Sequence, residues 1–228
     1  MRRVAQIMGM PITIDIPDCD NEAVFETVFD RLRQIDERLS TYKSGSEVSR
    51  FIRGEITKKD LSTELKKIIK ACKKAEVDTD GYFSAWAGDK FDPLGYIKGW
   101  AIAKAGEVIE RQGYKTYCIG AGGDILARSD SDKVWNIGIQ DPTNRYKILN
   151  KLSISSSAVA TSGNYERGAH IINPKTKKLA DHWASVTITG PDIITADVLA
   201  TAAFAAGKNA PDLLKKHKAY RAILVAKS

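Results

Sequence analysis

The chain has 228 residues, enough for a sizeable hydrophobic core, and we expect residues 1–228 to form a single domain. Hydrophobic residues make up 43% of it and charged residues 28%, as in an ordinary soluble globular protein. The net charge is +7, but the basic residues come mostly as short pairs without interleaved aromatic residues, so we expect no nucleic-acid-binding surface.

Cysteine usage and the terminal sequence bear on location. Cys19, Cys72 and Cys118 are odd in number and show no CxxC spacing, which argues against a disulfide framework and for a reducing compartment. No apolar run precedes Pro11, so we expect no signal peptide. The longest apolar stretch, residues 198–206, is about half the length that a membrane span needs. We therefore expect a cytoplasmic protein without a membrane span.

The first third of the chain alternates between strand and helix patterns. Isoleucines at every second position over residues 12–16 predict a strand, and an apolar stripe over residues 22–39 predicts an amphipathic helix. The polar stretch 40–47 follows as a loop with several hydroxyl groups. A second helix begins after Ser62, which can cap it, and ends in the turn 78–81.

The most informative stretch of the sequence is residues 91–100. A proline and a glycine predict a turn over residues 92–96, and apolar spacing then predicts a helix from about Ile97 to Gly113. This places Lys98 at a helix N-terminus, where free N–H groups and the helix dipole favour an anion. Lys98 is then either a phosphate ligand or an ordinary surface lysine.

Strands and helices are interspersed in the rest of the chain without a strict βαβ rhythm, which predicts an α+β fold with mixed β-sheets and packed helices. The glycines at 120–123 follow a strand but do not open a helix, so they indicate close backbone approach rather than a dinucleotide-binding loop. A helix is predicted over residues 194–206, followed by a last helix and strand. Further strands are predicted over residues 117–119, 134–139, 148–154, 170–172 and 183–189.

Two places in this second half could carry chemistry. Asp197 and Thr201 are four residues apart on a predicted helix, so a carboxylate and a hydroxyl face the same way and suit Mg²⁺. Alternatively, Asp197 is favoured by the helix dipole and Thr201 bonds back to its own helix. His170 is a lone histidine, which fits either a structural group or a catalytic base.

Five stretches in order carry a family resemblance. They are Asp92…Lys98-Gly99, Gly122-Gly123-Asp124, Thr161-Ser162-Gly163-Asn164-Tyr165-Glu166, His170-Ile171-Ile172-Asn173-Pro174-Lys175-Thr176, and Ala196-Asp197…Ala200-Thr201-Ala202. Together they resemble the ApbE-type family of FAD:protein FMN transferases, in a compact form without a lipoprotein signal. The similarity runs from Met8 to about Gly207.

The resemblance implies an α+β, T-fold-like architecture of two related halves that enclose a flavin cleft. It implies Mg²⁺-dependent transfer of FMN from FAD to a threonine or serine of a target protein, with release of AMP. By position, the metal ligands are Asp197, Thr201 and the backbone carbonyl of Gly95. His170 matches the proposed base, and Lys98 acts with Asp197 in catalysis. The expected FAD contacts are Met8, Tyr42, Tyr82, Phe83, Asp92, Lys98 and Ile171.

The chain departs from the family pattern at several positions, and two other functions remain open. The departures are Met10, Ile52, Ser84, Asn173 and Lys177, where the family often has threonine, asparagine, aspartate, aspartate and glycine. One alternative is an FAD pyrophosphatase, in which water replaces the acceptor hydroxyl. The other is a non-catalytic FAD-binding carrier, against which the Asp197 and Thr201 pair argues.

Overall fold

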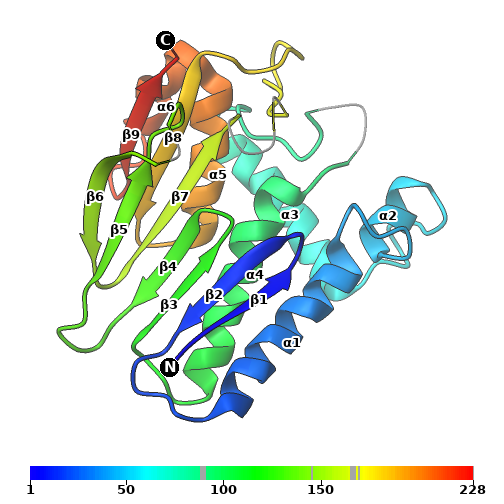
Figure 1. The fold of residues 1–228 in the computed structure, drawn as a ribbon. Helices are drawn as coiled ribbons and strands as arrows, with labels where there is room; N and C mark the ends of the chain where they lie inside the picture. Colours follow the sequence, from blue (N-terminus) through cyan, green and yellow to red (C-terminus); the bar gives the residue numbers. More distant parts are fainter. Residues whose placement is uncertain (88–90, 145, 165–167, 169, 228) are drawn as a thin grey trace.

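The computed structural model describes residues 1–87, 91–144, 146–164, 168 and 170–227. Among these residues, seven strands form one sheet in the order β1-β2-β3-β4-β7-β8-β9, and β5 pairs with β6 in a separate ribbon (Figure 1). Every strand pair is antiparallel. The bounds are β1 Arg2–Ile7, β2 Met10–Asp15, β3 Tyr117–Ala121, β4 Asp124–Arg128, β5 Trp135–Gln140, β6 Ile148–Ile154, β7 Ser157–Gly163, β8 Trp183–Gly190 and β9 Arg221–Ala226.

The two ends of the seven-stranded sheet repeat one connectivity. At one end β1 and β2 form a hairpin, helices follow, and β3 returns beside β2. At the other end β7 and β8 pair, helices follow, and β9 returns beside β8. This repetition agrees with the two related halves that the family resemblance implies. The helices are α1 Glu22–Leu39, α2 Glu47–Ile52, α3 Thr63–Asp78, α4 Leu94–Arg111, α5 Ile193–Ala206, the 3₁₀ turn Gly207–Asn209 and α6 Ala210–Leu214.

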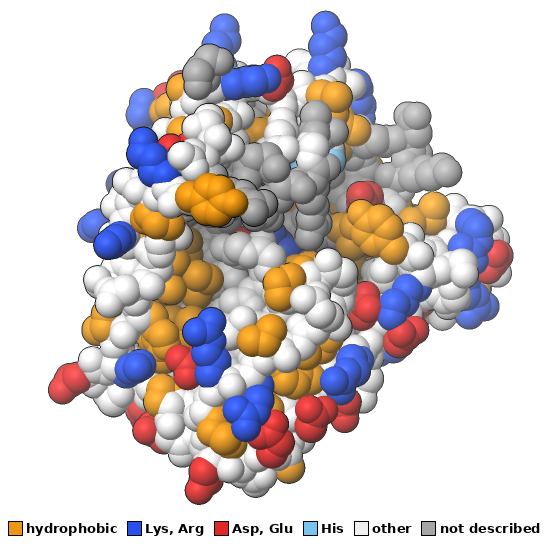
Figure 2. Space-filling view, in the orientation of Figure 1, with side chains coloured by type: hydrophobic (Ala, Val, Ile, Leu, Met, Phe, Trp, Pro, Cys, Tyr) orange, Lys and Arg blue, Asp and Glu red, His pale blue; other side chains and the backbone are white. Residues whose placement is uncertain are grey.

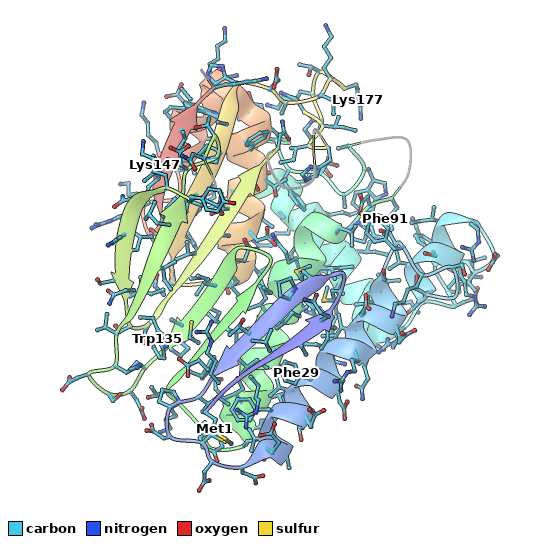
Figure 3. All side chains as sticks on the ribbon, in the orientation of Figure 1. Met1, Phe29, Phe91, Trp135, Lys147 and Lys177 are labelled. Atoms are coloured by element: carbon cyan, nitrogen blue, oxygen red, sulfur yellow. The ribbon has the colours of Figure 1, made fainter. Side chains whose placement is uncertain are left out.

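The long helices cover one face of the sheet, and α4 lies between α1 and α5 (Figure 1). In α1 the predicted stripe is buried, including Phe25, Val28 and Leu32. On β2, Ile12 and Ile14 point into the same core. The ribbon β5–β6 is attached to the sheet through Trp135 at its lower end (Figure 3), whose indole N–H donates to Asp15 at 3.0 Å. No helix in the described part of the chain has the length and apolar composition to cross a membrane.

Helix α5 is buried on nearly all sides, because it is enclosed by β7, β8, α4 and α6. Eleven of its fourteen residues are buried, and most are alanines. A helix that is apolar all round is expected in such a position. The small side chains let the α4 backbone approach closely: a β-carbon on Gly99 would lie 3.1 Å from Asp197 Cβ and 3.1 Å from backbone atoms of α5.

Three local predictions differ from the structure. Helix α4 begins at Leu94 and not near Ile97, because the Asp92 carboxylate accepts the Leu94 N–H at 3.0 Å and starts the helix earlier. Residues 170–172 form only an isolated bridge, between Ile172 and Leu179. Strand β7 was not predicted as a strand, because its sequence is a run of small residues. Its alanines pack against α5 but have low strand propensity.

We predict that Gly99→Ala lowers the stability of the protein. The new methyl group would meet backbone atoms of α5, which cannot rotate away, and we expect a net loss of about 1–2 kcal/mol despite the better helix propensity of alanine. Chemical denaturation measures the loss. Gly45→Ala is the control, because a β-carbon on Gly45 meets nothing within 4 Å. Equal stability of the two variants would show that the contact between α4 and α5 can accommodate the added methyl group.

Candidate functional site

A cavity of about 690 Å³ opens where both halves of the sheet meet the helices. Its walls come from the β1–β2 turn, the end of α1, the segment 82–87, the start of α4, the β3–β4 turn, the end of β7, residues 170–174 and α5. The structure brings together every residue that the sequence predicts for the site. The lining includes Met8, Tyr42, Tyr82, Phe83, Asp92, Gly95, Lys98, His170, Ile171, Asp197 and Thr201.

The floor of the cavity lies where two strands of the sheet part. Strands β4 and β7 pair only from Ile125 and Val159 to Ala127 and Ser157. Beyond that point the Asp124 carboxylate, which is fully buried, accepts the Thr161 N–H at 3.1 Å. A side chain therefore satisfies a backbone donor that has lost its strand partner.

Lys98 lies between two buried carboxylates. Its ammonium nitrogen is 2.7 Å from Asp124 Oδ2 and 3.6 Å from Asp197 Oδ1. The other oxygen of Asp197 accepts the Gly99 N–H at 3.0 Å. Because α4 begins at Leu94, Lys98 belongs to the second helical turn, and its predicted position at the helix N-terminus is wrong. It is an ion-paired lysine of the cavity wall, and its side chain is 19% exposed.

The buried position of Asp197 changes its acidity. Burial raises the pKa of the Asp197 carboxyl to about 7, and the nearby Asp124 carboxylate acts in the same direction. The Lys98 ammonium and the Gly99 N–H lower this pKa but do not offset the burial. Two ionised carboxylates next to one ammonium carry a net negative charge. One further cation, either a proton or a metal ion, would balance this charge.

The residues around Asp197 offer a set of hard oxygen donors. The Thr201 hydroxyl lies 3.3 Å from the Ser162 hydroxyl, so it faces β7 and the cavity. Gly95 is close by, since a β-carbon there would lie 3.9 Å from Thr201 Oγ1. No group of three or more His, Cys, Asp or Glu side chains that could hold a metal occurs in the described part of the chain. The donor set suits Mg²⁺, which keeps several waters and binds proteins through one or two carboxylates plus substrate phosphates.

His170 lines the cavity with an exposed side chain. Its Nδ1 lies 2.8 Å from the Gly168 carbonyl oxygen. Because a carbonyl oxygen can only accept, Nδ1 carries the proton in this contact and Nε2 keeps a lone pair. His170 is thus able to accept a proton at Nε2.

Aromatic side chains line another part of the cavity wall. The Tyr82 hydroxyl accepts a hydrogen bond from the Asn209 side chain at 2.9 Å. Phe83 is buried, and its N–H donates to the Thr79 hydroxyl at 3.1 Å. Tyr42, in contrast, is 84% exposed. Tyr82 and Phe83 are therefore held in place by hydrogen bonds and packing, whereas the Tyr42 ring is open to solvent.

The structure explains two departures from the family pattern. The Asn173 amide donates to the Ala205 carbonyl at 2.8 Å, near the end of α5, which an ionised aspartate could not do. Lys177 has a φ of 59°, the left-handed region in which glycine fits best. The resemblance at residues 161–166 extends to Tyr165 and Glu166, which lie outside the described residues.

Sequence reasoning missed the role of two neighbours of this site. Asp124 was part of a recognised motif, but nothing in its spacing indicated a contact with Lys98. Ser162 lies in a run of small polar residues, which has no periodic signal. Lys and Arg are interspersed with Asp and Glu among the coloured residues on the face drawn in Figure 2.

Comparisons with known proteins find one family. A family model described as the ApbE family matches residues 8–93 and 87–224. The chain is 24% identical to the FAD:protein FMN transferase of Haemophilus influenzae over 83% of this chain and 74% of that protein, and 23% identical to that of Vibrio cholerae over 86% and 77%.

Solved structures share the fold. The flavin transferase ApbE from Vibrio cholerae superposes with a TM-score of 0.85 at 20% identity, covering 100% of this chain and 94% of that chain. The ApbE protein from Thermotoga maritima gives 0.85 at 22% identity, covering 99% and 94%. The predicted α+β architecture is confirmed.

We predict that Asp197 makes the metal-free protein less stable as the pH rises from about 4 to about 7. In that window the carboxyl stays protonated in the folded state, where its pKa is about 7, but is ionised in the unfolded chain, where it is 3.8. Unfolding therefore releases a proton, and raising the pH favours it. The stability of Asp197→Asn relative to the parent should rise across this window and level off above it.

Denaturant titrations at several pH values, with EDTA present, measure this difference. Asp192→Asn is the control, since Asp192 is a partly buried helix cap outside the ion-pair arrangement, and its carboxylate accepts the Thr195 N–H. A constant difference between parent and Asp197→Asn across the window would contradict the prediction.

Proposed function

The chain belongs to the ApbE family, and we propose that it is an enzyme that transfers FMN from FAD to a threonine or serine hydroxyl of a target protein, with Mg²⁺, and releases AMP. We further propose that residues 1–228 act as one domain. One observation carries the proposal: the same cavity is lined by aromatic side chains, by a lysine between two carboxylates, and by a histidine whose Nε2 can accept a proton. The names of the relatives in Haemophilus influenzae and Vibrio cholerae support the activity.

The cavity has the chemistry that FAD requires. Its volume of about 690 Å³ lies in the range of ordinary ligand sites. Tyr82 and Phe83 offer aromatic and apolar surface for the isoalloxazine ring. Lys98 offers a cation for the pyrophosphate, and the oxygens of Asp197 and Thr201 face the same space.

We propose that Mg²⁺ is held by Asp197, Thr201 and the Gly95 carbonyl. In a regular helix the Gly99 N–H would bond to the Gly95 carbonyl one turn earlier. Here that N–H donates to Asp197 Oδ2, which weakens its hydrogen bond to the Gly95 carbonyl. The Gly95 carbonyl oxygen could then serve as a metal ligand. When bound, the ion would neutralise charge on the pyrophosphate and make AMP a better leaving group.

His170 completes the proposed reaction. Nε2 of His170 accepts the proton of the acceptor hydroxyl while its oxygen forms a bond to the FMN phosphorus. The bond from that phosphorus to the bridging oxygen breaks, and AMP leaves with the electron pair. Lys98, ion-paired with Asp124, stabilises the negative charge that develops on the phosphate oxygens.

One experiment separates transfer from the two alternatives. The protein is incubated with FAD and Mg²⁺, with and without a cell extract of the source organism. The products are then resolved by chromatography and protein mass spectrometry. FMN bound to a protein together with AMP is the expected result. Free FMN and AMP in equal amounts without an acceptor would indicate a pyrophosphatase, and unchanged FAD would indicate a carrier.

We predict that Lys98 contributes to FAD binding through the phosphates. Lys98→Ala alone would leave buried Asp124 without its cation and destabilise the protein, so the test uses Lys98→Met with Asp124→Asn. We expect the double variant to bind FAD about 10–100-fold more weakly, because a charge-assisted contact contributes roughly 1.5–3 kcal/mol. Riboflavin, which has no phosphate, should bind as before in the same fluorescence titration.

Asp124→Asn alone is the matched control for this prediction, since its amide oxygen can still accept the Thr161 N–H. Equal losses of affinity for FAD and riboflavin would show that Lys98 does not bind the phosphates.

We predict that His170→Asn slows FMN transfer by about 10²–10⁴-fold, the usual contribution of a general base. FAD affinity should change little, because the base acts mainly during the reaction. Single-turnover transfer to the identified acceptor, with a parallel FAD titration, measures both. His182→Asn, at an exposed histidine that does not line the cavity, is the control. A folded, FAD-loaded His170→Asn protein with the parental rate would refute the role.

A further inference from the structure

The turn 173–179 contains a lysine in an unfavourable backbone conformation. The turn is closed by hydrogen bonds from the Asn173 N–H to Lys178 and from the Lys177 N–H to Asn173, at 2.8 and 2.9 Å. Lys177 adopts a φ of 59°, which a residue with a β-carbon rarely occupies. Such a conformation persists where its surroundings require it, and it points to a function for the side chain.

Two lysines of this turn reach across to the same wall of the cavity. The Lys177 ammonium donates to the Ala87 carbonyl at 3.2 Å. The Lys175 ammonium lies 3.9 Å from the centre of the Tyr82 ring, a close cation–π contact. Tyr82 and Ala87 are the first and last cavity-lining residues of segment 82–87. One turn therefore contacts this wall at both of its ends.

The wall 82–87 is held at both of its ends. The start of the wall is also fixed from the C-terminal part, because Asn209 donates to the Tyr82 hydroxyl at 2.9 Å. At the far end, the Ala87 carbonyl accepts from Lys177. Pro174, in the same turn, lines the cavity itself.

We propose that Lys175 and Lys177 are positioning residues that hold the 82–87 wall closed against bound FAD and slow its dissociation. This inference rests on the proposed function for the identity of the ligand. Glycine at 177 would fit the backbone better but could not reach Ala87.

The test uses substitutions that separate the tether from the backbone strain. Lys177→Gly removes both, and Lys177→Met removes the tether while keeping the β-carbon in the left-handed conformation. Lys175→Met removes the cation from the face of Tyr82. Lys178→Met is the control, because it removes the same charge from the same turn at an exposed residue with no side-chain contact to the wall.

We expect Lys177→Gly and Lys177→Met to raise the FAD dissociation rate by about 5–10-fold in stopped-flow fluorescence, and to raise KM for FAD. Thermal stability should be unchanged or higher for Lys177→Gly, since the strain is relieved. Hydrogen exchange of the amides in segment 82–87 should accelerate in both variants without any ligand. The Lys178→Met control should match the parent in all four measurements.

An unchanged FAD dissociation rate in Lys177→Gly would overturn the inference. An equal increase of this rate in Lys178→Met would also overturn it, because the net charge of the turn, and not the contact with Ala87, would then slow dissociation. A parent protein that binds no FAD would refute the proposed function instead. In that case hydrogen exchange alone tests the positioning role. Faster exchange of segment 82–87 in the Lys177 variants than in the parent would support the role, and equal exchange would overturn it.

Discussion

The structure of the site depends on one buried ion-pair arrangement, in which Lys98 lies between Asp124 and Asp197. Burying three charges is costly, and removing one partner of such a pair typically destabilises a protein by about 3–5 kcal/mol. The arrangement is tolerated because the Thr161 and Gly99 N–H groups supply further hydrogen bonds to the two carboxylates. It joins β4, β7, α4 and α5 at the point where the sheet parts. The cavity is therefore a consequence of how these charges are satisfied.

The same arrangement explains why this place suits a cation. Burial raises the pKa of the Asp197 carboxyl, and the nearby Asp124 carboxylate acts in the same direction. A proton on Asp197 balances the charge, and a divalent ion with oxygen ligands from Asp197 and Thr201 would do the same. The proposed metal would therefore compete with a proton for Asp197. Close packing produces this position, since the absence of a side chain on Gly99 lets Asp197 come within reach of the α4 backbone.

Periodicity predicted the parts of the fold that have one buried and one exposed side, and it missed strand β7, which is buried on both faces. Helix α1 has a buried and an exposed side, so its stripe was visible, as was the alternation in β2. Strand β7 is enclosed between β4, β8 and α5 and is built of small residues, which have no period. The start of α4 depended on a contact of Asp92 that spacing does not reveal. Lys98, His170 and Asp197 were candidates from the sequence itself, whereas Met8 and Tyr42 came only from the family resemblance, because these residues meet only in three dimensions.

The turn 173–179 shows how departures from a family pattern can depend on one another. Asn173 bonds to the Ala205 carbonyl near the end of α5, the helix that carries Asp197 and Thr201. Lys177, four residues later, bonds to the wall that carries Tyr82. Asn173 also organises the turn through its side-chain oxygen, which accepts the Lys175 and Thr176 N–H groups at 2.9 and 3.2 Å. The turn therefore connects the end of α5, through Asn173, with the wall that carries Tyr82, through Lys177. One turn thus contacts two parts of the cavity wall that lie far apart in the sequence.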